Sequence, residues 1–307
     1  MTNAIPQRHL SLKGWGLLIL LALIWGGSFT ANHAALAEFP VPTVVAARVT
    51  GAALVLWAYI ALARLPVPVT WGFARTALVL GVFNNIVPFS LIVWGQTHIA
   101  SGLAGILNAS TAVFGVLIAA AAFPDERLTL PRLVGVLCGF AGVVVVIGPD
   151  ALTHLDLTSL GQLAILAAGL SYAVAGAYAR QTLKGIRPEV SAAAMLTASA
   201  LIMAPTALIL NGAPPRPGPE TLAALAYLSV MASAVAYRLF YTILQLAGAG
   251  NLGLVTLLIA PVAVVLGAVL FHEALPPQAF AGMVLLTLGM VVLDGRALRW
   301  IATRFSA

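Results

Sequence analysis

The chain has 307 residues, of which 61% are hydrophobic and only 8% are charged, and its formal net charge is +6. Soluble domains carry roughly 25% charged residues, so this composition excludes an ordinary water-soluble protein and places the chain in a lipid bilayer. The single cysteine, Cys138, lies in an apolar run, which excludes a disulfide framework.

Apolar runs of about 20 residues recur along the chain, long enough to cross a hydrocarbon core of ~30 Å as helices. Short separators that carry proline, glycine or charge stand between them. We therefore predict an all-α polytopic membrane protein with ten transmembrane helices, five in each half. In chain order, these helices span roughly residues 14–34, 41–62, 75–95, 100–122, 132–148, 159–179, 189–210, 221–244, 252–271 and 278–294.

The second half of the chain repeats the first at a constant offset of 147 residues. Pairs at this offset are Glu126 and Glu273, Gly135 and Gly282, and Gly142 and Gly289. We predict two five-helix repeats, at residues 14–148 and 159–295. Because five is odd, the second repeat enters the membrane from the opposite side, and such inverted repeats are typical of carriers whose site lies between the halves. The first run matches residues 161–181, so we expect a retained helix and not a signal peptide.

The basic residues predict the orientation of these helices. With the N-terminus in the cytoplasm, only Arg216 falls outside, and Arg48 and Arg238 lie within spans. The remaining twelve basic residues fall inside: Arg8, Lys13, Arg64, Arg75, Arg127, Arg132, Arg180, Lys184, Arg187, Arg296, Arg299 and Arg304. This excess follows the positive-inside rule and predicts a bacterial inner-membrane protein with both termini cytoplasmic. We interpret the positive charge as a topology signal and expect no nucleic-acid partner.

Several short motifs recur in the two repeats. The first repeat carries Leu23-Ile24-Trp25-Gly26-Gly27-Ser28-Phe29, Ala47-Arg48, and Glu126-Arg127-Leu128 with Gly135 and Gly142; the second carries Pro261, Glu273, Gly282 and Gly289. Together they resemble the EamA-type repeat of the drug/metabolite transporter superfamily over nearly all of residues 14–295. The proline expected near Ala112–Phe114 is absent, although its counterpart Pro261 is present. The resemblance implies an export carrier for amino acids, aromatic ones in particular, and related metabolites.

Polar and aromatic residues inside the predicted spans are the candidates for binding a small-molecule cargo, because polar groups in hydrocarbon usually face other helices or a cavity. Asn84 and Asn85 lie one turn before Pro88, which cannot donate a hydrogen bond to the Asn84 carbonyl, so we expect the backbone to open there. The candidate site residues are Trp25, Ser28, Asn84, Asn85, Trp94, Asn108, Tyr172, Tyr178, Tyr237, Arg238 and Tyr241.

Simpler interpretations stay open for these candidates. Small polar residues on one helix face often serve only close packing, and aromatic residues near span ends form an interfacial belt. Trp25 corresponds to Tyr172 and Trp94 to Tyr241 at the repeat offset, which would suit a flat apolar cargo at the axis between the halves.

Three charged residues need separate interpretations. Arg48 and Arg238 can both snorkel to the interface. Because Arg238 is flanked by Tyr237 and Tyr241, we favour it over Arg48 as the partner of a cargo carboxylate. Glu126 lies at a helix end, where we expect it to cap a helix or face the interface.

Two classes of function are compatible with an apolar helical chain, a carrier and a membrane-embedded enzyme. An enzyme needs a nucleophile with its base, paired carboxylates or a metal cluster. The histidines are scattered, and no acidic residue lies near a predicted helix centre. We therefore expect a carrier that is not an enzyme, has no cofactor and contacts only its cargo and the bilayer; the sequence leaves its oligomeric state open.

The same absence of midspan acids bears on energy coupling, because proton-driven carriers commonly use a membrane carboxylate. We expect alternating access without obligatory proton antiport. The alternative is a multidrug or other metabolite exporter with proton antiport, in which His98 is the first residue to suspect.

The predicted orientation can be tested with single cysteines at Arg216 and Lys184 in a cysteine-free background. An impermeant thiol reagent added to intact cells should label position 216 and spare position 184. Labelling of position 184 from outside would contradict cytoplasmic termini.

Overall fold

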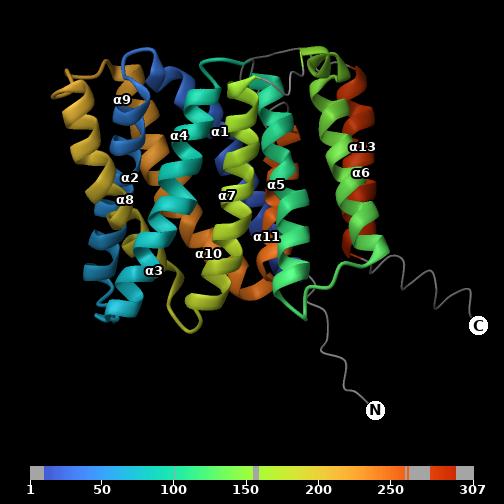
Figure 1. Cartoon of the computed structure of the whole chain (residues 1–307), viewed down its shortest axis with the longest axis horizontal. Helices are drawn as coiled ribbons and strands as arrows, with labels where there is room; N and C mark the ends of the chain where they lie inside the picture. Colours follow the sequence, from blue (N-terminus) through green and yellow to red (C-terminus); the bar gives the residue numbers. More distant parts are fainter. Residues whose placement is uncertain (1–9, 100, 155–158, 260, 263–276, 295–307) are drawn as a thin grey trace, which may run out of the picture.

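The computed structural model describes residues 10–99, 101–154, 159–259, 261–262 and 277–294, and every element it describes is a helix (Figure 1). The helices are α1 (Leu12–Leu36), α2 (Val41–Leu62), α3 (Trp71–Gly81), η1 (Val82–Ile86), α4 (Val87–Gly95), α5 (Ser101–Ala122), α6 (Leu130–Ile147), η2 (Pro149–His154), α7 (Leu160–Thr182), α8 (Pro188–Asn211), α9 (Pro219–Ala226), η3 (Tyr227–Val235), α10 (Ala236–Ala247), α11 (Ala249–Gly253) and α13 (Pro277–Asp294). We call the end at which α1 begins the lower end, as in Figure 1.

The predicted all-α membrane fold is confirmed. Seven helices are long and apolar enough to cross a membrane, and three shorter apolar helices accompany them in the described residues. These ten segments match the ten predicted spans. Two spans are composite: α3, η1 and α4 form one, and α9, η3 and α10 form another. The ninth begins at Ala249 and is described to Ile259, so the rest of its predicted range, with Glu273, lies outside the described residues.

Local sequence signals define the helix ends. The hydroxyls of Ser11 and Thr70 accept hydrogen bonds from the backbone N–H groups of Gly14 (3.1 Å) and Phe73 (3.2 Å), which satisfies donors that have no partner in the first turn. Gly248, with φ of 88°, is the only residue between α10 and α11. Glycine tolerates this left-handed conformation, so the chain reverses there and starts α11 at the lower end.

The two halves are inverted and interleaved. α1 runs from the lower to the upper end, whereas α7, its counterpart in the second half, runs downward (Figure 1). Most helices of the first half pack on helices of the second: α2 on α8, α1 on α9 and α10, and α5 on α7 and α11. The pocket described below lies among these contacts, so both halves build its walls.

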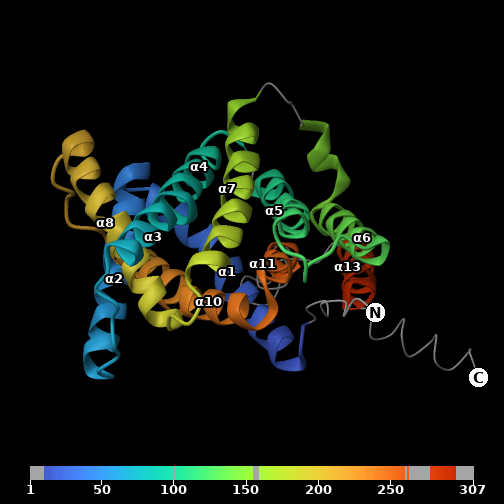
Figure 2. The same ribbon diagram turned by 60° about the horizontal axis from the view of Figure 1, so that its bottom comes forward.

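A glycine seam joins α6 to α13, which lie side by side at one edge of the molecule (Figure 2). A Cβ added to Gly135 would lie 2.8 Å from the Gly289 carbonyl oxygen, and a Cβ added to Gly142 would lie 2.9 Å from that of Gly282. Gly135 and Gly142 are the repeat counterparts of Gly282 and Gly289, so each helix presents the same positions to the other. The seam therefore has the antiparallel, twofold arrangement that inverted repeats require.

Replacing Gly142 by leucine should destabilise the protein, because the new Cβ would lie 2.6 Å from the Leu286 backbone nitrogen. Overpacking of this kind costs about 1–3 kcal/mol or more. Gly16→Leu is the matched control, since no atom lies within 4 Å of its added Cβ. Thermal unfolding in detergent should show a lower midpoint for Gly142→Leu alone; equal midpoints would contradict the close packing of this seam.

Candidate functional site

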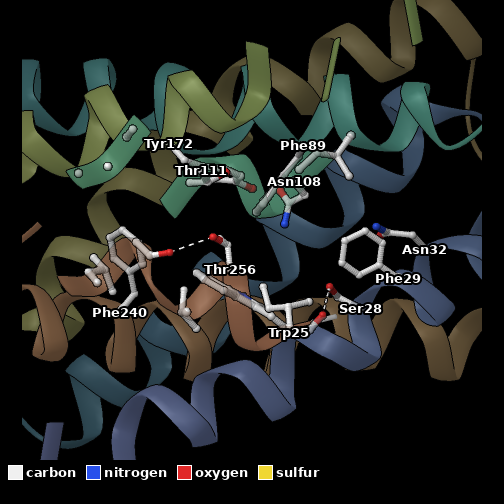
Figure 3. Close-up of a pocket in the computed structure, with 18 of the residues that line it drawn as sticks. Trp25, Ser28, Phe29, Asn32, Phe89, Asn108, Thr111, Tyr172, Phe240 and Thr256 are labelled. Atoms are coloured by element: carbon white, nitrogen blue, oxygen red, sulfur yellow. Dashed lines mark hydrogen bonds between the residues drawn. The ribbon is translucent and has the colours of Figure 1, made fainter. Parts of the chain in front are cut away.

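A pocket lies between the two halves, within the helical bundle. In Figure 3, Trp25, Ser28 and Phe29 of α1 lie on one side, and Asn108, Thr111 and Tyr172 lie on the other. The lining residues used below are Trp25, Ser28, Phe29, Asn32, Arg48, Phe89, Val93, Asn108, Thr111, Gly115, Tyr172, Gly176, Phe240, Ala249, Val255 and Thr256. Aromatic and aliphatic groups dominate this set, with one cation and a few neutral polar groups among them.

Equivalent positions of the two repeats line this pocket. Four pairs of lining residues are separated by the repeat offset: Trp25 and Tyr172, Phe29 and Gly176, Val93 and Phe240, and Asn108 and Val255. A pocket lined by equivalent positions of two inverted repeats lies at the axis that relates them, where carriers bind their cargo.

The third span contains a widened turn, the π-helix η1 (Val82–Ile86), near the pocket. Val87 donates its N–H to the Val82 carbonyl, the i→i+5 bond of a π-helix, which leaves the Phe83 carbonyl without its α-helical donor. The Ser171 hydroxyl donates to this carbonyl (2.6 Å), and the Tyr237 hydroxyl donates to the Asn84 carbonyl (2.9 Å). The backbone opening expected before Pro88 is therefore present, and side chains of the second half satisfy its carbonyls.

A second widened turn lies in the eighth span, which has no proline there. Ala236 donates its N–H to the Met231 carbonyl, so the Ala232 carbonyl is left for other donors. The Trp25 indole N–H and the Arg48 Nη2 both donate to it, each at 3.0 Å. One freed carbonyl of the second half thus orients an aromatic ring and a cation of the first half.

Arg48 is buried in the pocket wall, with 5% of its surface exposed. Its Nε donates to the Ser233 hydroxyl (2.8 Å), and its guanidinium carbon lies 3.9 Å from the Phe89 ring centroid. Among the described residues, no carboxylate pairs with Arg48. Its remaining N–H groups can donate to an anionic ligand.

Arg238, which we favoured from sequence, lies elsewhere. Its side chain is 52% exposed and donates to Glu189 (2.8 Å), so its charge is already compensated. Arg238 faces outward from α10 and does not line the pocket, whereas Arg48 does, so a contact of Arg238 with cargo stays a prediction. The sequence neighbours Tyr237 and Tyr241 point to another face of that helix and are buried.

Of the predicted site residues, Trp25, Ser28, Asn108 and Tyr172 line the pocket, and the other seven do not. Asn84 donates to the Met195 sulfur (3.3 Å) and Asn85 to the Ser199 hydroxyl (2.9 Å), so both lie against α8. A direct contact of Asn84 or Asn85 with cargo stays a prediction.

The four aromatic residues among the seven that do not line the pocket lie in different surroundings. Trp94, the next-to-last residue of α4, packs against His98 with ring centroids 4.2 Å apart and ring planes tilted by 43°. Tyr237 packs edge-on against Trp25 (6.2 Å), where it supports a pocket residue. Tyr241 donates to the Met195 sulfur (2.9 Å), and Tyr178 is half-buried against the core.

Sequence reasoning missed Phe29, Phe89 and Phe240 among the lining residues. Phe240 lies at the repeat offset from Val93, so applying the offset to every midspan position would have paired them. No comparable signal marks Phe89, because its place in the pocket depends on how α4 resumes after the widened turn.

Three polar atoms of lining residues are buried without a hydrogen-bond partner among the described residues: Asn32 Oδ1, Asn108 Oδ1 and Thr111 Oγ1. Buried polar groups are nearly always satisfied, so a cluster of unsatisfied ones indicates a ligand or water. An amide can turn either its oxygen or its NH₂ group toward a ligand. Opposite an arginine, such groups can hold the ammonium end of a zwitterion.

Within the described residues, no group of three or more histidine, cysteine or carboxylate side chains lies close enough together to hold a metal ion.

The fold defines a multi-pass membrane protein with a pocket between its two halves. The model of the EamA-like transporter family matches residues 12–148 and 159–293. The chain belongs to this family, and it is a transporter of small molecules.

Several relatives align over almost their whole length. A protein of Streptantibioticus cattleyicolor named "Probable terminal-alkyne amino-acid exporter" is 28% identical over 94% of this chain and 95% of its own. A protein of Escherichia coli (strain K12) named "Probable amino-acid metabolite efflux pump" is 25% identical over 95% and 97%. A solved crystal structure shares the fold, with a TM-score of 0.77 and 20% identity over 92% of this chain and 98% of that one.

Alanine variants should separate cargo contacts from structural contacts. Asn85→Ala loses the bond to Ser199 and should lower stability by about 0.5–1.5 kcal/mol. The side-chain oxygens of both residues are unsatisfied, but Asn108 has no counterpart to the Ser199 bond in the described residues, so Asn108→Ala should leave the unfolding midpoint unchanged or higher while weakening cargo binding. Thermal unfolding and binding of labelled cargo are measured for both. A stability loss for Asn108→Ala as large as that for Asn85→Ala would contradict this separation.

Proposed function

We propose that this protein exports an amino acid with an apolar, aromatic side chain from the cytoplasm by alternating access. It does so as a bacterial inner-membrane carrier with both termini cytoplasmic and without enzymatic activity. The observation that carries the proposal is the pocket between the repeats, which combines aromatic walls with the buried, unneutralised Arg48.

The chemistry of the pocket supports an amino-acid cargo. Arg48 is placed to donate to a carboxylate, and arginine forms stronger, more directional bonds with carboxylates than neutral donors do. Asn108 and Thr111 offer neutral polar atoms without partners in the described residues. Trp25, Phe240 and the other rings offer flat apolar surface for an aromatic side chain. One relative is named "Probable terminal-alkyne amino-acid exporter" and another "Probable amino-acid metabolite efflux pump", and both names support this assignment.

The residues that line the pocket also bear on whether transport is coupled to protons. The described lining residues include no carboxylate, lysine or histidine. We therefore propose that cargo moves down its own gradient without obligatory proton antiport. His98, the residue suspected of proton transfer, lies beside Trp94 and is exposed.

The alternative is a multidrug exporter driven by protons. Its usual cargo is a lipophilic cation, which a buried arginine repels unless a nearby anion compensates. Arg48 therefore favours anionic or zwitterionic cargo over cationic drugs.

Counterflow in proteoliposomes tests the proposal. Vesicles preloaded with tryptophan should take up labelled tryptophan, while tryptamine, which lacks the carboxylate, and a lipophilic cation should compete poorly. Arg48→Met copies Met195, the residue at the equivalent position of the second repeat. It should lower the kcat/KM for tryptophan by about 10–100-fold, since a hydrogen bond to a charged group contributes about 1.5–3 kcal/mol. It should also abolish the preference for tryptophan over tryptamine.

Arg48→Lys, which keeps the positive charge, should retain part of the preference for tryptophan over tryptamine. The control is Arg216→Gln, which removes an exposed charge from the loop after α8 and should behave as wild type. Transport of the lipophilic cation alone would favour the multidrug alternative. Uphill accumulation driven by an imposed pH gradient would contradict transport without protons.

A further inference from the structure

A second cavity lies at the lower end of the molecule, below the cargo pocket. Its walls include Asp125, Arg180, Lys184, Tyr241 and Gln245. Its free volume is about 590 Å³, against about 80 Å³ by the same measure in the cargo pocket. The lower cavity is therefore wide and partly charged, whereas the cargo pocket is narrow and apolar.

Only a thin wall separates the two cavities. On α7, Gly176 lines the cargo pocket and Arg180, one turn further down, lines the lower cavity. On α10, Phe240 lines the pocket and its neighbour Tyr241 lines the cavity, and their rings pack edge to face with centroids 5.2 Å apart. A short displacement of α7 or α10 would connect the two spaces.

Ion pairs fill this wall. Arg180 bonds both Asp125 and Glu126, which follow α5, and Arg132 of α6 donates to Glu126 (3.1 Å). Two acids and two arginines give no net charge. The ion pairs of Arg180 thus hold α7, in the second half, against the α5–α6 connection of the first half.

Glu126 also holds in place a residue that lines the cargo pocket. Glu126 is fully buried and accepts the backbone N–H groups of Ala249 and Gly250, each at 2.8 Å. It caps the start of α11, which is one of the two roles expected for it from sequence, the other being a place at the interface. Ala249 lines the cargo pocket, so the ion pairs lie directly beneath the cargo.

We propose that the lower cavity is the chamber through which cargo enters, and that the Asp125–Glu126–Arg132–Arg180 cluster is its gate, closed in this structure. This inference rests on the proposed transport function. Closed, the ion pairs are largely dry and strong; once water enters, they lose most of their strength, which lowers the cost of opening. Arg132 Nε and Nη1 are buried without partners in the described residues, so the closed cluster is not fully satisfied.

Thiol accessibility tests the gate without requiring transport. In a Cys138→Ala background, Gly176→Cys places a thiol in the cargo pocket, where no atom lies within 4 Å of the added Cβ. The rate of modification is measured with cationic and anionic impermeant reagents from each side, in right-side-out and inside-out vesicles. Arg180→Gln should raise the modification rates of both reagents from the lower side by about tenfold or more. The labelling rate follows the population of the open state, and a minor state populated at about 0.1–10% can increase by this factor. Arg180→Lys, which keeps the charge, should raise the rates less.

The control is Arg187→Gln, which removes an exposed charge at the same end without touching the cluster. It should leave the rates unchanged. Unchanged rates in a folded Arg180→Gln protein, or opposite changes for the two reagents, would overturn the gate. If Arg180→Gln fails to fold, Arg180→Lys and Asp125→Asn decide by the same rates. Faster labelling of the Arg180→Gln protein, together with no amino-acid counterflow by the wild-type protein, would support the gate and reject the proposed cargo. The failure of the gate and the failure of the proposed function are therefore distinguishable.

Discussion

Backbone groups within a bilayer must find their hydrogen-bond partners inside the protein, and this constraint shapes the centre of the molecule. The widened turns in the third and eighth spans free the carbonyls of Phe83 and Ala232. Each is satisfied from the other half, the first by Ser171 and the second by Trp25 and Arg48. The repeats are therefore joined by reciprocal hydrogen bonds, and the groups that make these bonds surround the pocket.

The pattern of the sequence predicts the helices well because bilayer thickness and backbone satisfaction leave few alternatives to apolar helices of one length. The repeat offset and Pro88 likewise predict the inversion and the first widened turn. The second turn lies at Tyr227–Val235, where the sequence has no proline, so local sequence could not reveal it. The burial of Arg48 could not be predicted for a related reason, since the freed Ala232 carbonyl is one of the groups that accept a hydrogen bond from its guanidinium.

The two halves share a backbone plan but differ in charge at its centre. Arg48 of the first repeat corresponds to Met195 of the second, which receives Asn84 and Tyr241 as hydrogen-bond donors to its sulfur. One side of the axis thus carries a cation and the other an apolar, polarisable side chain. The symmetry of the scaffold therefore does not extend to charge, since Arg48 lines the pocket whereas Met195 is fully buried and does not line it.

The glycine seam has a consequence for biosynthesis. α13 is the last described helix, and among the described helices it packs mainly on α6, which was synthesised about half a chain earlier. Until α13 is inserted, α6 exposes its glycine face to lipid without the partner that fits it. Helix association in lipid depends on close packing of such faces, so the first repeat cannot reach its final assembly while the ribosome is still making the second. A chain that terminates before α13 therefore leaves an unpaired glycine face of α6 in the membrane.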